Sequence, residues 1–330
     1  MRTKKVICIL CAILVTVSFF GCKKDASDIA HVSVSEVTHS VFYAPQYAAI
    51  ELGYFEDEGI EIELINGGGA DNVMTAVLSG QVDIGFAGPE AAIYVINEGM
   101  EDSPKVFCRL TQKDGSFIIS REKENNFDYS EFSGKHIIGG RKGGVPLMTL
   151  MYVLKDHGVY EGDVNMDTSV DFNNMVSAFT SGVGDYVTAF EPTASMLERE
   201  GIGHIVASVG KDSGEIPYTA YFAKQSYIKE NRDVVLGFTR AIYKAQQWIK
   251  ATDNAEIARV ISPYFADTDI SLLESSVTRY KQIEAWSDNP LLEEESLNRL
   301  MDVMDYSGEL KARPSYEDTV DTSIAQEVMK

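Results

Sequence analysis

The sequence predicts an α/β clamshell of two lobes, each built on a mainly parallel sheet flanked by helices, with a helical C-terminal cap. Strand-like and helix-like segments alternate through residues 31–90, as in a parallel sheet covered by helices. The length of 330 residues fits two lobes of roughly 100–150 residues each. A short pattern also recurs 102 positions later, which suggests two lobes with similar strand ends: Ala76, Ser79, Gly80 and Asp83 return as Ala178, Ser181, Gly182 and Asp185.

The first lobe begins with two segments that alternate apolar and polar residues, 31–37 and 60–65, which predict strands. Residues 45–52 and 72–78 predict the helices that follow these strands. A third strand, residues 82–86, ends in Gly-Pro-Glu. A helix that begins directly after this strand exposes free backbone N–H groups at the carboxyl end of the strand. Open α/β sheets usually bind their ligands at such strand ends.

The second lobe repeats this organisation. Residues 117–120 and 135–140 predict strands, and a helix begins at Pro146 and ends at Gly158. The repeated strand, residues 185–190, ends in Glu191-Pro192. We therefore assign residues 114–218 to lobe 2.

Residues 219–223 predict a strand that returns to the first lobe, and the chain then becomes helical. Apolar residues keep helical spacing through residues 234–249, and three further amphipathic stretches follow at 257–265, 270–283 and 291–304. We assign residues 31–113 and 219–330 to lobe 1 with its C-terminal helices.

The charge balance excludes a nucleic-acid partner. Acidic residues outnumber basic ones by 50 to 29, and the formal net charge is −21. A surface of this charge repels phosphate backbones. It is typical of a solvated protein surface.

The first 21 residues predict a signal peptide. Lys4 and Lys5 precede an apolar run, residues 6–20, which is shorter than the ~20 residues of a membrane span. Gly21 before Cys22 resembles a bacterial lipoprotein signal, although two phenylalanines precede it where that signal usually has leucine and a small residue. The resemblance implies an acylated Cys22, a tether over residues 22–30 and a protein held outside the membrane. An uncleaved anchor would tether the chain on the same face.

The cysteines and histidines do not form a metal or redox motif. Three of the four cysteines lie in residues 1–22, so the folded part has only Cys108, in an apolar strand context typical of a buried small side chain. The five histidines are scattered without metal-ligand spacing. We expect no metal and no cofactor.

Several motifs resemble one family of binding proteins. The blocks Gly53-Tyr54-Phe55, Val82-Asp83-Ile84-Gly85 and Glu191-Pro192, with the Ser-Gly-x-x-Asp pattern, are similar to solute-binding proteins of ABC importers. The similarity is to the branch that binds alkanesulfonates, nitrate and thiamine precursors (pyrimidines). It implies a type II periplasmic-binding-protein fold with a two-strand hinge. It also implies a monomer that delivers a small solute to an ABC permease and its ATPase.

Ligand contacts are expected on loops at the carboxyl ends of strands. Glu90 can be interpreted equally well as a ligand contact or as a carboxylate that is stabilised by a helix N-terminus. For Glu191 the same two interpretations apply, and the family resemblance favours the ligand contact. Gly143 and Gly144 fit either a ligand-facing helix start or a simple loop. The full set of candidates is Ser40, Tyr43, Gln46, Gly88, Glu90, Ser116, Phe117, Gly143, Gly144, Val145, Glu191, Tyr218 and Tyr221.

Tyrosines and carboxylates in this set favour a flat, nitrogen-rich heteroaromatic ligand, such as a thiamine-precursor pyrimidine. An alkanesulfonate, taurine or nitrate site would instead gather Arg, Ser, Thr and N–H donors around oxygen atoms. The sequence does not predict an enzyme. A pyrimidine-synthase-like enzyme would carry a cysteine-rich motif, and a ligand sensor would carry an effector domain; neither is evident in the sequence.

Overall fold

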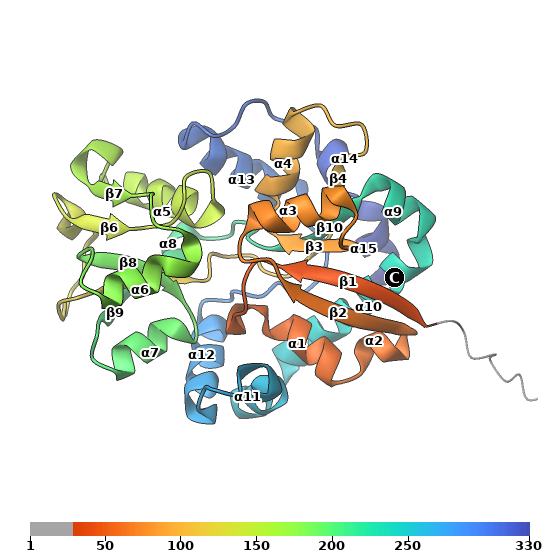
Figure 1. Ribbon diagram of the computed structural model, residues 1–330, viewed down its shortest axis with the longest axis horizontal. Helices are drawn as coiled ribbons and strands as arrows, with labels where there is room; N and C mark the ends of the chain where they lie inside the picture. Colours follow the sequence, from red (N-terminus) through yellow and green to blue (C-terminus); the bar gives the residue numbers. More distant parts are fainter. Residues whose placement is uncertain (1–28) are drawn as a thin grey trace, which may run out of the picture.

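Two five-stranded sheets form the centres of two lobes in the computed structural model, which describes residues 29–330 (Figure 1). The first sheet has the order β2-β1-β3-β10-β4, and the second has the order β7-β6-β8-β5-β9. Cys22 and the predicted signal peptide lie outside the described residues, so the lipid anchor stays a prediction. The strands of the first sheet are β1 (Ala30–Glu36), β2 (Ile60–Asn66), β3 (Ile84–Ala87), β4 (Pro104–Arg109) and β10 (Ala220–Lys224); those of the second are β5 (Ser116–Ser120), β6 (His136–Ile138), β7 (Asn165–Asp167), β8 (Tyr186–Phe190) and β9 (His204–Ser208).

The two sheets have the same topology. In each, the second strand pairs in parallel with its neighbours on both sides, and the fourth strand runs antiparallel between the third and the fifth. The antiparallel strand is β10 in the first sheet and β5 in the second, and each of these has just crossed from the other lobe. The predicted pair of mainly parallel sheets flanked by helices is confirmed.

The repeated sequence pattern corresponds to a repeated structural feature. Asp83 precedes β3, and its carboxylate accepts hydrogen bonds from the backbone N–H and the hydroxyl of Ser33 on β1, at 2.9 and 2.7 Å. Asp185 precedes β8, and its carboxylate accepts one from the backbone N–H of His136 at the start of β6, at 2.9 Å. Each aspartate therefore ties the start of a strand to its parallel neighbour.

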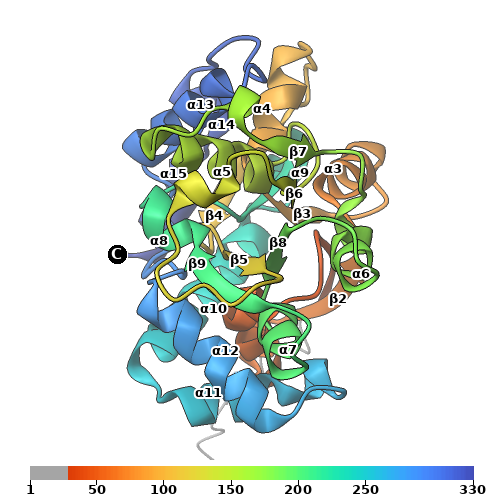
Figure 2. The ribbon, with the colours of Figure 1, turned by 90° about the vertical axis from the view of Figure 1, so that its left-hand side faces the viewer.

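Helices cover both faces of each sheet (Figures 1 and 2). Short 3-10 turns join some of them, including η1 (Val41–Tyr43) and η4 (Phe172–Asn174). Lobe 1 has α1 (Ala44–Glu51), α2 (Tyr54–Asp57), α3 (Ala70–Ser79) and α4 (Glu90–Asn97), and lobe 2 has α5 (Val145–Asp156), α6 (Met175–Thr180), α7 (Thr193–Arg199) and α8 (Val209–Ser213). The predicted helical C-terminus comprises α9 (Gln225–Glu230), α10 (Arg232–Ala251), α11 (Asn254–Ile261), α12 (Ile270–Gln282), α13 (Glu294–Tyr306), α14 (Tyr316–Thr319) and α15 (Thr322–Val328).

The C-terminal helices contact both lobes. Helix α10 packs against α1 and α2 of lobe 1, whereas α12 packs against α7 and α13 against α5 in lobe 2. In Figure 2, α12 lies beside α7 at the lower edge of the second lobe. These helices therefore connect the lobes in addition to the two chain crossings.

The two crossings run side by side, at residues 110–115 and 214–219. The Thr219 N–H donates to the Thr111 hydroxyl at 2.8 Å, and the Leu110 N–H donates to the Thr219 carbonyl at 3.1 Å. The same pair of threonines also joins through their hydroxyls at 2.5 Å. Neighbouring strands linked in this way form a two-stranded hinge between the lobes.

The core of the described chain is apolar, and Cys108 on β4 is fully buried within it, as expected for a lone cysteine in that context. Within residues 29–330, no helix is both long and apolar enough to span a membrane. The same residues contain no group of three metal-ligating side chains placed to hold an ion.

Candidate ligand-binding site

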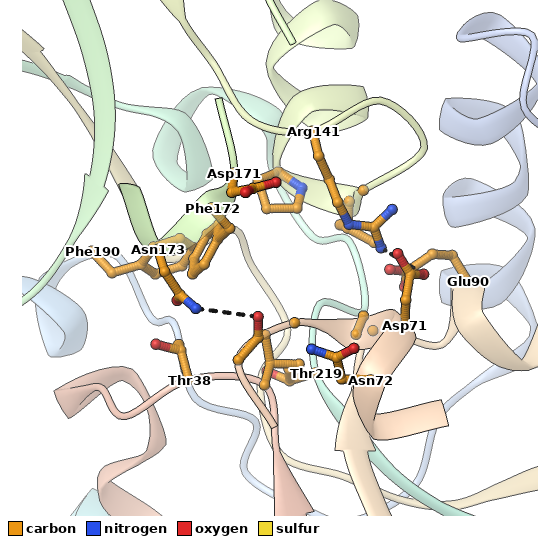
Figure 3. Close-up of a pocket in the computed structure, with 18 of the residues that line it drawn as sticks. Thr38, Asp71, Asn72, Glu90, Arg141, Asp171, Phe172, Asn173, Phe190 and Thr219 are labelled. Carbon is orange, nitrogen blue, oxygen red and sulfur yellow. Dashed lines mark hydrogen bonds and ion pairs between the residues drawn. The ribbon is translucent and has the colours of Figure 1, made fainter. Parts of the chain in front are cut away.

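A cavity of about 430 Å³ lies between the lobes (Figure 3). Lobe 1 lines it with residues that follow β1, β2 and β3, and lobe 2 with residues that follow β6 and β7 and with Phe190, the last residue of β8, while the hinge closes its base. All of these strands end at the cavity with their carboxyl ends, where open α/β sheets bind ligands. The lining residues are Val37, Thr38, Tyr43, Gly68, Gly69, Ala70, Asp71, Asn72, Gly88, Glu90, Arg141, Gly144, Val145, Pro146, Asp171, Phe172, Asn173, Asn174, Phe190, Tyr218 and Thr219.

Contacts across the cleft show that the lobes are closed on each other. The Arg141 guanidinium of lobe 2 lies 3.1 Å from the Asp71 carboxylate at the start of α3. The Asn173 amide donates to the Gly68 carbonyl at 3.4 Å, and Figure 3 shows this bond beside the cavity. On the α4 side, the Tyr94 hydroxyl donates to the Gly143 carbonyl at 2.9 Å. These contacts join the two lobes beside the cavity.

Four aromatic side chains give the cavity a largely apolar wall. Phe172 and Phe190 have ring centroids 5.9 Å apart, and Phe190 lies 6.2 Å from Tyr218. The Tyr43 ring is held edge-on against Phe86 of the lobe 1 sheet, at 4.5 Å. Rings held in place by their neighbours offer flat faces on which a planar ligand can stack.

Glu90, the first residue of α4, supplies the most unusual polar group in the cavity. Its side chain is 3 % exposed, and its Oε2 atom has no hydrogen-bond partner. Burial raises the pKa of this carboxyl to about 7, against the lowering effect of nearby Arg141. The side chain folds back over Gly88, where an added Cβ would lie 1.9 Å from Oε2, so a larger residue there would displace the Glu90 carboxyl. An unsatisfied buried acceptor is costly unless a ligand supplies the donor.

Tyr218 on the second crossing is the other lining residue whose buried hydroxyl forms no hydrogen bond of regular geometry, although the Asp114 carboxyl lies close to it. Burial raises its pKa well above the usual range, and the nearby Asp114 carboxyl adds to this. Asp114 lies on the first crossing, and burial raises its own pKa to about 7. Tyr218 is therefore a neutral hydroxyl that can donate or accept a hydrogen bond at the base of the cavity.

The charges around the cavity are mostly acidic. Asp71, Glu90 and Asp171 contribute carboxyl groups, and Arg141 is the only basic residue among the described residues that line it. Figure 3 shows Arg141 beside Asp71 and Glu90, opposite Phe172 and Phe190. Because Arg141 already pairs with Asp71, little free positive charge remains for an anionic ligand.

Six of the candidates from the sequence line this cavity: Tyr43, Gly88, Glu90, Gly144, Val145 and Tyr218. They come from four different loops, which the chain brings together only when the lobes close. Whether each of them contacts a ligand stays a prediction.

Six others lie elsewhere. Ser40 accepts from the Phe42 N–H and faces a neighbouring hollow, and Gln46 is bonded to Glu36 and Tyr221 within lobe 1. Tyr221 is fully buried in the core, stacked on Phe86 at 4.3 Å. The remaining three are also placed away from the cavity wall: Ser116 and Phe117 are buried on β5, and Gly143 faces a separate groove beside α5.

The prediction that the Glu191 carboxylate faces the ligand is wrong in this structure. The carboxylate is fully buried and accepts hydrogen bonds from the Ser195 N–H and hydroxyl, at 3.0 and 2.8 Å. It also forms a 2.8 Å ion pair with Arg279 of α12. The backbone of Glu191 is held as well, because its carbonyl accepts from the Ser40 hydroxyl at 2.7 Å and its N–H donates to Tyr280 at 2.9 Å. Glu191 therefore joins three parts of the fold.

Sequence reasoning missed the segment after β7. Asp171, Phe172, Asn173 and Asn174 all line the cavity, yet β7 is only three residues long and has no clear alternating pattern. The polar run Asp171-Phe172-Asn173-Asn174, rich in turn-forming residues, was the available signal. Two residues of the Gly67-Gly68-Gly69 run, Gly68 and Gly69, also lie at the cavity wall and adopt positive φ angles of 69° and 149°, which favour glycine.

Comparisons with known proteins place this chain in a family. The model of the NMT1-like family matches residues 37–262. The chain belongs to the NMT1-like family. It is also 44 % identical over 309 residues to YtlA of Bacillus subtilis strain 168, a protein named as a binding protein, and this match covers 93 % of the chain and 92 % of YtlA.

Solved structures share the fold of this NMT1-like protein at low sequence identity. The alkanesulfonate-binding protein SsuA of Xanthomonas axonopodis pv. citri, bound to MOPS, matches with a TM-score of 0.73 and 16 % identity, over 89 % of this chain and 98 % of that one. The nitrate-binding protein NrtA of Synechocystis PCC 6803 matches with a TM-score of 0.69 and 16 % identity, over 91 % and 88 %. These similarities establish a periplasmic-binding-protein fold.

Proposed function

We propose that this NMT1-like protein is the extracytoplasmic solute-binding component of an ABC importer. It traps one small molecule between its lobes and delivers it to a permease driven by an ATPase. The observation that carries the proposal is the inter-lobe cavity, to which each sheet contributes the carboxyl ends of three strands. Family membership and fold similarity to alkanesulfonate- and nitrate-binding proteins support the same role. In this proposal the mature chain is a monomer anchored through acylated Cys22.

The proposed ligand is a flat, nitrogen-rich heteroaromatic of the thiamine-precursor type. The rings of Tyr43, Phe172 and Phe190 support stacking of a planar molecule. The unpartnered Glu90 oxygen calls for a donor such as an amino or ring N–H group. This assignment moves the ligand-binding carboxylate from Glu191 to Glu90.

An alkanesulfonate, taurine or nitrate is the second candidate, favoured by one observation. The first turns of α3 and α5 lie at the cavity wall, and helix N-termini attract anions. Against it, Asp71 and Glu90 already occupy the helix starts on the lobe 1 side. The single lining arginine is also engaged by Asp71. We therefore rank the heteroaromatic ligand first.

We further propose a binding role without catalysis. The one cysteine of the described chain, Cys108, is fully buried on β4 and does not line the cavity. Burial also raises the pKa of its thiol, which disfavours the nucleophilic thiolate. The relatives reported above are named as binding proteins, which supports the same interpretation.

Isothermal titration calorimetry of the mature protein tests the ligand class. A 4-aminopyrimidine is expected to bind with a stoichiometry of one, and nitrate and an alkanesulfonate are expected to bind weakly or not at all. Glu90→Gln should weaken aminopyrimidine binding by about 1–3 kcal/mol, as expected for loss of a charged hydrogen-bond partner. Glu98→Gln is the matched control, because Glu98 caps the other end of α4 and is exposed. Tight binding of an anion alone would replace the heteroaromatic ligand with the second candidate.

A further inference from the structure

Glu90 has a buried carboxyl group, and its Oε2 atom accepts no hydrogen bond from the groups around it. The elements packed around it contribute Tyr43 from η1, Asp71 from α3, Tyr94 from α4, Arg141 from the loop before α5, and Tyr218 from the hinge. The three tyrosines are neutral, because burial raises the pKa of each hydroxyl. None of these groups donates a hydrogen bond to Oε2.

The charge balance near Glu90 leaves room for one more positive charge. Arg141 and Asp71 form an ion pair of their own at 3.1 Å, so their charges largely cancel. Asp171 faces the same cavity from lobe 2, as Figure 3 shows, and no basic lining residue balances it. An ionised Glu90 would therefore add a buried negative charge that no free cation of the wall offsets, while Asp171 faces the cavity from its exposed side. A bound cation would remove this charge, whereas a bound anion would oppose it.

We propose that Glu90 recognises a cationic planar nitrogen group on the solute, of the amidinium or protonated aminoheteroaromatic class, and releases its own proton when the solute binds. This inference rests on the proposed function, which it deepens by fixing the charge of the ligand. In the ligand-free protein below about pH 7 the carboxyl keeps its proton. When the cationic group enters, the proton leaves to solvent, and the resulting carboxylate accepts the ligand N–H. Charge balances, because the cation replaces the proton and no other reactant is needed.

The pH dependence of binding follows from the position of this carboxyl. Its pKa in the ligand-free protein is raised to about 7 by burial. Below that pH, binding of the cation must displace a proton, so affinity is expected to rise about tenfold per pH unit between pH 5 and pH 7. Above it the carboxyl is already ionised, and the dependence flattens. An anionic ligand would show the opposite trend.

A set of ligands with one shape and different charges tests the inference. Benzamidine is a planar cation, benzamide is its neutral counterpart, and benzenesulfonate is an anion of similar size. Calorimetry at pH 6 in two buffers with different ionisation enthalpies gives both affinity and the number of protons released. Benzamidine is expected to bind at least tenfold more tightly than the other two and to release close to one proton at pH 6, and much less than one at pH 8.

Two variants assign the proton. Glu90→Gln should abolish the proton release and lower benzamidine affinity at least tenfold at pH 8, while Glu98→Gln on the same helix should change neither. Circular dichroism checks that both variants fold, and the proton count of the wild-type protein remains decisive if Glu90→Gln does not. Tighter binding of benzenesulfonate, benzamidine binding without proton release, or no binding of benzamidine would each overturn the inference. The first result would leave solute binding itself intact, which separates this inference from the proposed function.

Discussion

The two strand ends of this protein differ although their sequences are similar. Strand β3 leads into Pro89-Glu90 at the start of α4, and β8 leads into Glu191-Pro192 at the start of α7. Both glutamates are buried, at 3 % and 0 % exposure. The Glu90 Oε2 atom has no partner, whereas the Glu191 carboxylate has Ser195 and Arg279.

This difference shows that the role of a buried carboxylate depends on its hydrogen-bond and ion-pair partners. Its position at the end of a strand does not determine that role. Glu191 is satisfied because α12 from the C-terminal region supplies a guanidinium, so its ion pair holds distant parts of the fold together. Glu90 is given no such partner, which leaves it available to a ligand. The strand end of lobe 2 thus holds the fold together, whereas that of lobe 1 presents an unpartnered acceptor for the ligand contact proposed above.

The largest effect is expected from removing the partner of Glu191. Arg279→Ala leaves a buried carboxylate without its counter-charge and should lower the free energy of unfolding by about 4 kcal/mol, measured by urea denaturation. Arg199→Ala is the control, because its pair with Asp269 is exposed on both sides and should cost less than about 1 kcal/mol. Equal losses for the two variants would contradict the structural role of Glu191.

The next effect concerns the stability of the ligand-free protein as a function of pH. The pKa of Glu90 is about 7 in the folded state and 4.5 ordinarily, so the folded state binds the proton more tightly than the unfolded state. Glu90 therefore costs stability that grows from pH 4.5 to pH 7 and then levels off, reaching about 3 kcal/mol. Glu90→Gln should recover this at pH 8 and gain little at pH 4, measured by thermal denaturation. A variant less stable than wild type at pH 8 would show that Glu90 is a stabilising carboxylate like Glu191.

A smaller effect is expected at the contact between the Glu191 strand end and lobe 1. The Ser40 hydroxyl donates to the Glu191 carbonyl at 2.7 Å and accepts from the Phe42 N–H at 3.2 Å. Ser40→Ala should lower the free energy of unfolding by about 1 kcal/mol, the usual cost of a lost cap. Ser133→Ala, at an exposed turn of lobe 2, should change it by less than half as much. Indistinguishable urea denaturation curves for the two variants would show that the Ser40–Glu191 hydrogen bond does not contribute to stability.

The smallest effect is expected from the ion pair across the cavity. Arg141 and Asp71 are 32 % and 73 % exposed, in contrast to the buried Glu191 of the other pair. Arg141→Ala should therefore change the free energy of unfolding by no more than about 1 kcal/mol. A loss as large as that of Arg279→Ala would show that the exposed pair, and not the buried one, holds the lobes together.

The local pattern of the chain predicted much of the architecture. Alternation identified β1 and β2, and the repeated Asp83 and Asp185 correctly marked equivalent strands in two lobes. These features depend on neighbours in sequence, because side-chain period and turn residues act over a few positions. The strand β7 was missed because three residues are too few to show a period.

Sequence by itself determined that this chain has two similar sheets, and that a strand end with an acidic residue lies at the edge of each. Only the tertiary structure decided which acid faces the cavity. Arg279 lies 88 residues beyond Glu191 in the chain. The sequence around Glu191 therefore does not predict that α12 packs against it and supplies a counter-charge. Burial and charge are properties of the surroundings in space, so the distinction between Glu191 and Glu90 emerges only when distant segments pack together.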